Sequence, residues 1–142
     1  MARMANGGSV HAATSWSFSP SAADISTARN QVADFVAVNG FAARCEDVRL
    51  MVSELVTNAI VHASSPCQIT VTLTSSSLRV EVADTSSVNP TLQRPSLTEV
   101  NGRGLFIVQA LATTWGVSSH HGGKTVWFEL AGLAAGSGSA AG

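Results

Sequence analysis

The most informative segment of the chain is Ser53-Glu54-Leu55-Val56-Thr57-Asn58-Ala59-Ile60-Val61-His62-Ala63. It sets an acid, Glu54, and an amide, Asn58, four residues apart within an otherwise apolar helical pattern. Residues four apart lie on one face of an α-helix, so both side chains can reach the same small ligand. A carboxylate can accept a proton or orient a hydroxyl group, and an amide oxygen can coordinate a hard cation. The pair suits the chemistry of a magnesium-bound nucleotide, although the same spacing also occurs by chance on solvated helices.

The helix that contains this segment is expected to span residues 44–63. Its apolar positions form one broad stripe, made by Val48, Met51, Val52, Leu55, Val56 and Ala59. At roughly 100° per residue, Glu54 and Asn58 are about 40° apart and about 110° from the middle of that stripe. Both residues therefore lie at the border of the stripe, where the floor of a cleft can be built.

The other elements follow from the period of the apolar residues and from the Gly, Pro and Ser positions that interrupt it. In chain order we expect a strand at 14–18, a helix at about 21–39, the helix at 44–63, a hairpin of strands 67–73 and 78–83, an aperiodic loop at 84–101, a helix at 104–115, and closing strands at 115–119 and 124–130. Tight turns between neighbouring strands require antiparallel pairing. The predicted fold is α+β, a two-layer sandwich in which three helices cover one face of a mixed, mostly antiparallel sheet.

The two ends of the chain are rich in small residues with little to pack. We expect residues 1–13 and 131–142 to form disordered tails, which leaves one domain at 14–130. A domain of this length can bury a core without disulfides or metals. Cys45 and Cys67 have neither CxxC nor metal-ligand spacing and are expected to be reduced, buried thiols.

Composition and charge exclude several functions. The chain has 142 residues, of which 45% are apolar and 12% charged, and its formal net charge is -1. No apolar run approaches the roughly 20 residues of a membrane span, and the eight basic residues are scattered. We therefore expect no membrane insertion and no direct binding of nucleic acid. The first 13 residues lack the features of a secretory signal, which predicts a cytoplasmic protein.

A second group of candidate residues surrounds the long loop. Asp84 ends a hairpin strand, and Gly102-Arg103-Gly104 precedes the third expected helix. The N-terminus of a helix offers unpaired N–H groups and a positive dipole end, and glycines let a phosphate approach the backbone. Arg103 adds a cation. An aperiodic loop as long as 84–101 is expected to act as a lid over a ligand.

Together these motifs resemble the Bergerat-fold (GHKL) ATP-binding superfamily. The resemblance covers residues 14–130 and rests on Glu54-Leu-Val-Thr-Asn58-Ala-Ile-Val-His62-Ala63 as its N-box, Asp84 as the acid of its first glycine box, Gly102-Arg103-Gly104-Leu105 as its second, and Gly123-Lys124-Thr125-Val126-Trp127-Phe128-Glu129-Leu130 as its closing strand. Within the superfamily the chain is most similar to the short, single-domain anti-sigma-factor serine/threonine kinases. Sensor histidine kinases normally carry a phosphoacceptor helical domain as well, for which this sequence has no room.

The resemblance implies an ATP-dependent protein serine/threonine kinase that uses Mg²⁺. It implies that Glu54 acts as general base or orients the substrate hydroxyl and that Asn58 ligates the magnesium. Asp84 would accept a hydrogen bond from the adenine amino group, with Thr125 supporting it through a water molecule. The phosphates would be held by Gly102, Arg103 and Gly104.

The resemblance also implies partners. The phosphoryl acceptor would be a serine of an anti-sigma-factor antagonist protein of the STAS type, and the kinase would regulate a sigma factor by binding it. Relatives commonly pair as homodimers, but the sequence leaves the oligomeric state open.

One segment departs from the family pattern. The first glycine box usually reads Asp-x-Gly-x-Gly, whereas this chain has Asp84-Thr85-Ser86-Ser87-Val88. The turn below adenine must then be made by residues that carry Cβ atoms. This departure supports an alternative function, a non-catalytic regulatory binding module of the same fold with weak or no nucleotide binding. A stand-alone ATPase is a third, weaker hypothesis.

Four other residues have simpler interpretations. His62 is expected to pack at a helix end, and His120 and His121 to occupy a turn. Lys124, the only lysine of the chain, is expected to be an exposed strand start rather than a phosphate ligand.

Overall fold

The computed structural model describes residues 10–19, 21–59, 66–85 and 104–131, within which five strands form one sheet in the order β1-β2-β3-β5-β4. The described elements are β1 (Val10–Phe18), α1 (Ala22–Val36), a π-helical turn (Ala37–Phe41), a 3₁₀ turn (Ala42–Arg44), α2 (Cys45–Asn58), β2 (Cys67–Thr74), β3 (Ser77–Asp84), α3 (Gly104–Leu111), β4 (Thr114–His120) and β5 (Gly123–Ala131).

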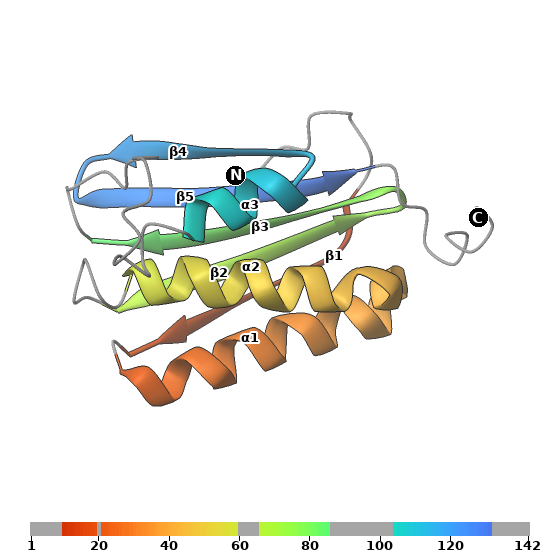
Figure 1. Cartoon of the computed structure of the whole chain (residues 1–142), viewed down its shortest axis with the longest axis horizontal. Helices are drawn as coiled ribbons and strands as arrows, with labels where there is room; N and C mark the ends of the chain where they lie inside the picture. The colour runs from red at the N-terminus through yellow and green to blue at the C-terminus, as the bar shows by residue number, and fades with distance from the viewer. Residues whose placement is uncertain (1–9, 20, 60–65, 86–103, 132–142) are drawn as a thin grey trace.

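The three described α-helices lie on one face of the sheet (Figure 1). α2 packs against α1 on one side and against α3 on the other. Trp16 of β1 meets Phe35 of α1 edge to face, with 5.9 Å between the ring centroids, which ties the first helix to the edge of the sheet. The predicted α+β sandwich is confirmed, and every described pair of neighbouring strands is antiparallel rather than mixed.

The core lies between the helices and the inner face of the sheet. Period-two alternation places three buried rows across the central strands: Leu73, Leu78 and Leu130; Val71, Val80 and Phe128; and Ile69, Val82 and Val126. The predicted apolar stripe of α2 is confirmed, because Val48, Met51, Val52, Leu55, Val56 and Ala59 are all buried. This packing fixes which side of α2 remains for a ligand.

α1 itself ends at Val36, and the helical geometry that continues into the π-helical turn stops where the sequence predicts, at Asn39-Gly40. Asn39 leaves helical geometry, and Gly40 has φ = 102° in the π-helical turn that leads to α2. A backbone with this φ strongly favours glycine, because other residues pay for the contact of Cβ with the backbone.

The edge strand begins earlier than predicted. Residues 10–13, expected in a disordered tail, belong to β1, where Ala12 pairs with Leu73 and Ala13 with Thr72. Ala12 and Ala13 are both small, so the sequence does not show the alternation that marks a half-buried strand. The strand forms nevertheless, because the backbone hydrogen bonds of the ladder do not depend on side-chain size. The other end of the domain is also longer, since β5 runs to Ala131. Residues 1–9 and 132–142 lie outside the described residues.

The third helix is shorter than predicted. It ends at Leu111, not at 115, while Trp115 lies in a strand as predicted, in β4, where it pairs with Phe128. The backbone N–H of Thr113 donates to the carbonyl of Glu129 at 2.8 Å, so the chain has already joined the sheet two residues after the helix. Leu111 and Trp115 lie four apart and suggest a continuing helix. Instead, the backbone leaves the helix and pairs with β5. The second helix was expected to reach 63, but residues 60–65 lie outside the described part.

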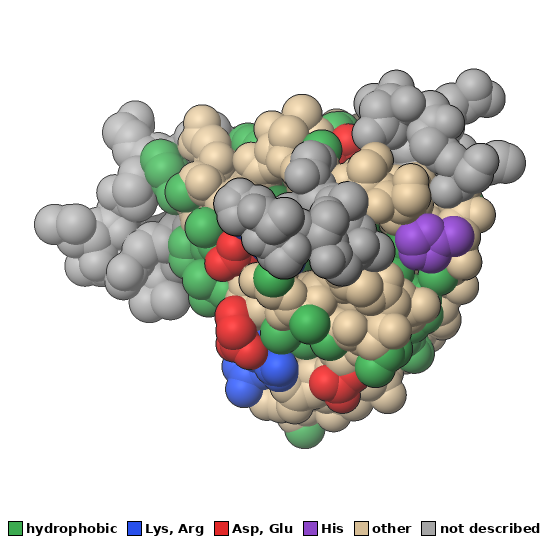
Figure 2. All heavy atoms as spheres, turned by 90° about the vertical axis from the view of Figure 1, so that its right-hand side faces the viewer, with side chains coloured by type: hydrophobic (Ala, Val, Ile, Leu, Met, Phe, Trp, Pro, Cys, Tyr) green, Lys and Arg blue, Asp and Glu red, His purple; other side chains and the backbone are tan. Residues whose placement is uncertain are grey.

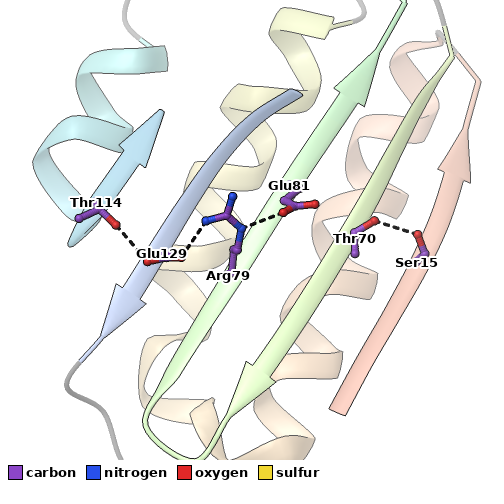
Figure 3. Close-up of polar contacts among 6 residues, drawn as sticks. All are labelled: Ser15, Thr70, Arg79, Glu81, Thr114 and Glu129. Atoms are coloured by element: carbon purple, nitrogen blue, oxygen red, sulfur yellow. Dashed lines mark hydrogen bonds and ion pairs between the residues drawn. The ribbon is translucent and has the colours of Figure 1, made fainter. Parts of the chain in front are cut away.

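The face of the sheet away from the helices is polar. Arg79 lies between Glu81 and Glu129, with 2.7 Å nitrogen–oxygen distances to both, and its guanidinium stacks 4.1 Å from the centroid of Trp127. Figure 3 shows Arg79 between its two acids, together with the contact of Thr114 to Glu129. Paired charges along this face explain how it can stand without a covering layer from the described helices and strands.

The end of the domain at the N-terminus of α2 carries two ion pairs. Arg44 pairs with Asp47 and Arg49 with Glu46, at 3.4 and 3.5 Å. In the space-filling view of that end, acidic and basic side chains lie next to each other (Figure 2). None of the described helices combines the length and the apolar character that a membrane crossing requires.

Candidate functional site

Four element ends meet at one end of the domain. The C-terminus of α2, the end of β3, the start of β5 and the start of α3 lie together at the left of Figure 1. These ends carry Asn58, Asp84, Lys124 and Gly104. Candidate residues from distant parts of the sequence thus come to one region, at the edge of the core.

Glu54 and Asn58 lie on the last turns of α2 at the border of its buried stripe. Both residues are half-buried, as the helical periodicity predicts. With the described residues, the Asn58 side chain makes no hydrogen bond, whereas Glu54 does take part in a polar interaction. An amide oxygen in this position fits the oxygen ligation that magnesium prefers.

Asp84 is the buried acid at the end of β3. It continues the inward-facing series of Leu78, Val80 and Val82, and only 6% of the residue is exposed. A carboxylate this deep needs a partner, since the desolvation of an unpaired charge costs several kcal/mol. Its location agrees with the sequence-based prediction of an acid at a strand end.

Lys124 is the partner of Asp84, and the expectation that this lysine is exposed is wrong. Its Nζ atom donates to both Oδ1 and Oδ2 of Asp84 at 2.9 Å, and only 5% of the residue is exposed. The two residues face each other directly in the register of β3 and β5, so both side chains point to the helix side of the sheet.

Sequence reasoning missed Lys124, although a signal was present. Lys124, Val126, Phe128 and Leu130 alternate in period two, which marks Lys124 as an inward position of a half-buried strand. A lone lysine on that face requires a buried acid as counter-charge, and Asp84 at the end of a neighbouring strand is the candidate.

Thr125 lies on the opposite face of the sheet. It pairs with Ala83, one residue away from the Asp84–Lys124 pair, and its Oγ1 lies 3.1 Å from Nε2 of His120 on the side away from the described helices. The structure therefore does not bring Thr125 next to Asp84. The physical reason is the period of a strand, in which a shift of one residue moves a side chain to the other face.

Gly123 allows β5 to approach β3 closely beside this ion pair. A Cβ atom at this position would stand 2.0 Å from the carbonyl oxygen of Asp84 and 2.9 Å from Cα of Thr85. Only a residue without a side chain fits there. Gly123 thus sets the distance between the strands at the point where Asp84 and Lys124 meet.

The predicted phosphate site is described only at its last residue. Gly104 is the first residue of α3, as expected for a helix N-terminus that follows glycine. Gly102, Arg103 and residues 86–101 of the predicted lid lie outside the described residues, as does His62. His121 lies in the turn to β5, as predicted, whereas His120 is the last residue of β4 and pairs with Gly123.

The charge of Asp84 in the candidate site contributes to the pKa of the Cys67 thiol. Burial and, to a smaller extent, the negative charges of Asp84 and Asp24 raise the pKa of its thiol from 9.0 to about 11. Cys67 is buried and Cys45 is half-buried, and both are free cysteines.

We expect this pKa shift to make unfolding easier in alkaline solution. The unfolded chain loses the Cys67 proton above pH 9 and the folded chain only near pH 11, so stability falls through this window by no more than about 2–3 kcal/mol. Urea midpoints measured from pH 7 to 11 should show the loss in the native chain and a smaller loss in Cys67→Ala. Equal slopes in the two proteins would contradict the assignment.

Comparison with known proteins gives a family match and matches to solved structures. The family described as histidine kinase-like ATPase domain matches residues 18–130. The fold is similar to the crystal structure of the RsbU and RsbW domains of Rv1364c from Mycobacterium tuberculosis, with a TM-score of 0.64 and 17% sequence identity over 85% of this chain. This chain covers only 32% of that one, and at such identity the likeness concerns the fold alone. No curated protein sequence matches the chain.

Proposed function

Since this chain belongs to the family of histidine kinase-like ATPase domains, we propose that it binds ATP with Mg²⁺ and transfers the γ-phosphoryl group to a serine of an antagonist protein. We further propose that it regulates a sigma factor by binding it, in the manner of the anti-sigma-factor kinases that its motifs resemble. The observation that supports the proposal is that the last turns of α2, which carry Glu54 and Asn58, lie at the same end of the domain as the end of β3, which carries the buried Asp84.

The residues present fit a magnesium nucleotide. Among the described residues, no group of three or more His, Cys, Asp and Glu side chains is arranged to hold a metal ion. Magnesium commonly relies on substrate phosphates and one or two protein oxygens rather than on a complete protein cage. Asn58 would supply such an oxygen, and the bound ion would neutralise charge on the phosphates.

Each protein group would have a separate role in the transfer. The serine oxygen forms a bond to the γ-phosphorus while the bond from that phosphorus to the β-phosphate oxygen breaks, and ADP leaves. The Glu54 carboxylate would accept the serine proton or orient the hydroxyl. Asp84 would accept a hydrogen bond from the adenine amino group, and the start of α3 at Gly104 would hold phosphate. Thr125 would have no role in the transfer, because its side chain lies on the face of the sheet opposite to Asp84.

A second candidate function is a binding module without catalysis. Both Asp84 oxygens already accept from Lys124, and the segment after Asp84 lacks the glycines of the usual nucleotide loop. Such a module would use the same surface to bind partners. Nucleotide binding without transfer to any antagonist protein would favour this function.

Glu54→Ala is expected to abolish transfer while ATP binding persists. Loss of a general base or orienting carboxylate costs roughly 10²–10⁴-fold in rate. The measurement is transfer of labelled γ-phosphate to a purified antagonist protein of the STAS type, together with calorimetric titration of ATP with and without magnesium. Glu46→Ala is the matched control, because Glu46 is an exposed acid at the other end of the same helix.

Asn58→Ala is expected to remove the magnesium dependence of ATP binding in the same titration. Unchanged magnesium-dependent affinity in Asn58→Ala would contradict the metal assignment. Unchanged transfer in Glu54→Ala would contradict the catalytic one.

A further inference from the structure

Lys124 has hydrogen-bonding capacity that its ion pair does not use. An ammonium group has three N–H donors. The Lys124 ammonium donates to Oδ1 and to Oδ2 of Asp84, at 2.9 Å each, which accounts for two of the three. Within the part of the chain that the structure describes, no further acceptor contacts this ammonium. Its side chain is 6% exposed, so bulk water has little access to it. A buried donor without an acceptor is unfavourable, and a ligand atom is one way to satisfy it.

The pair also presents two complementary groups side by side. The Asp84 carboxylate is an acceptor and the Lys124 ammonium is a donor, and both lie at the end of the sheet where β3 and β5 meet. Adenine shows the matching pattern, an amino donor flanked by ring nitrogens that accept. A carboxylate alone would recognise only the amino group.

We propose that Lys124 is a specificity-determining residue that donates a hydrogen bond to a ring nitrogen beside the adenine amino group, while Asp84 accepts from the amino group itself. This inference rests on the proposed function, because it uses the same nucleotide site. It assigns to Lys124 a direct contact with the base that the sequence motifs do not indicate.

Phosphate is a poorer partner for Lys124. To reach a phosphate, the ammonium would have to leave Asp84, which would strand a carboxylate that is 2% exposed without its cation. A contact with the base lets the ion pair persist. Guanine fits less well than adenine, because it carries a carbonyl oxygen where adenine carries the amino group and so sets an acceptor against Asp84.

The ligand side of the contact can be tested on the native protein. Calorimetric titrations should compare ATP with 1-deaza-ATP and 7-deaza-ATP, each of which lacks one ring nitrogen beside the amino group. A hydrogen bond from a charged donor makes the analogue without the contacted nitrogen bind roughly tenfold to a hundredfold more weakly than ATP. GTP is expected to bind more weakly than ATP.

The protein side uses two variants of matched size. Lys124→Met keeps the length of the side chain and removes all donors, so it should bind ATP and the weaker deaza analogue equally. Lys124→Arg keeps the charge and should retain part of the discrimination. A purely structural ion pair would change the affinity for all the nucleotides together and leave their ratios unchanged. Thermal unfolding of each variant shows whether it is folded, and if Lys124→Met is not, the native analogue series decides.

The outcomes separate the inference from the function on which it rests. ATP binding with both deaza analogues within about twofold of ATP overturns the role of Lys124, as does discrimination that survives in Lys124→Met. Tighter binding of GTP than of ATP overturns the contact with adenine. If the native protein binds ATP and discriminates but transfers no phosphate, the kinase proposal fails and the base contact stands. If none of the nucleotides binds, both fail.

Discussion

Asp84→Leu is expected to lower the free energy of unfolding by about 3–5 kcal/mol, because it leaves the Lys124 ammonium buried without a counter-charge. Lys124→Met should have an effect of similar size for the converse reason. The two side chains are 2% and 6% exposed, so solvent screens their interaction little. Urea denaturation, with midpoint and slope compared with those of the native chain, measures the loss.

The double variant Asp84→Leu/Lys124→Met separates the ion pair from packing. Replacing both charges by apolar groups of similar volume is often neutral or stabilising, so the double variant should be closer to the native chain than either single variant. Asp47→Ala is the control. Its ion pair with Arg44 is about one-third exposed on both sides and should contribute less than about 1 kcal/mol. Single-variant losses as small as this control would show that Lys124 reaches solvent in solution.

Gly123→Ala is expected to cost about 3 kcal/mol or more and to remove nucleotide binding. The new Cβ atom would lie 2.0 Å from the Asp84 carbonyl oxygen, and the contacted atoms are backbone that cannot rotate away. β3 and β5 must then separate at their ends. The loss of stability should therefore reach or exceed the upper end of the usual cost of overpacking, about 1–3 kcal/mol. Thermal unfolding and ATP titration measure the two effects.

Gly122→Ala is the matched control at the neighbouring position. Gly122 has φ = 89°, and no heavy atom of the described residues beyond its own chain neighbours lies within 4 Å of the added Cβ, so the substitution should cost only the roughly 1–2 kcal/mol of left-handed backbone strain. It should leave the Asp84–Lys124 pair and nucleotide binding unchanged. A Gly123→Ala protein as stable as Gly122→Ala would mean that the strands tolerate wider spacing than the structure shows.

Local patterns were sufficient for much of the fold. The apolar stripe of α2, the hairpin of β2 and β3, and the turn at Asn39-Gly40 all follow from periodicity and turn residues that span a few positions. The placement of Glu54 and Asn58 at the border of the α2 stripe, and of Asp84 at a strand end, could be predicted for the same reason. Each of these features depends on residues that are near one another in the chain.

The start of β1 and the end of α3 could not be predicted in this way. Backbone pairing with β2 draws residues 10–13 into the sheet, and pairing with β5 starts β4 at Thr114, which leaves α3 ending at Leu111. In both places the local apolar pattern is weak or ambiguous. The decision rests with hydrogen bonds to strands that are distant in sequence.

The chemical identity of the site likewise depends on register between distant strands. Amino-acid order alone placed an acid at residue 84 and a Gly-Lys-Thr run at 123–125, but it could not say which of Lys124 and Thr125 faces the acid. Tertiary pairing of β3 with β5 sets Lys124 against Asp84 and turns Thr125 to the other face. A shift of one residue would exchange them, because side chains alternate between the faces of a strand. Local periodicity thus determined the elements and their buried faces, whereas contacts across 40 residues of sequence decided that a buried lysine lies beside the acid.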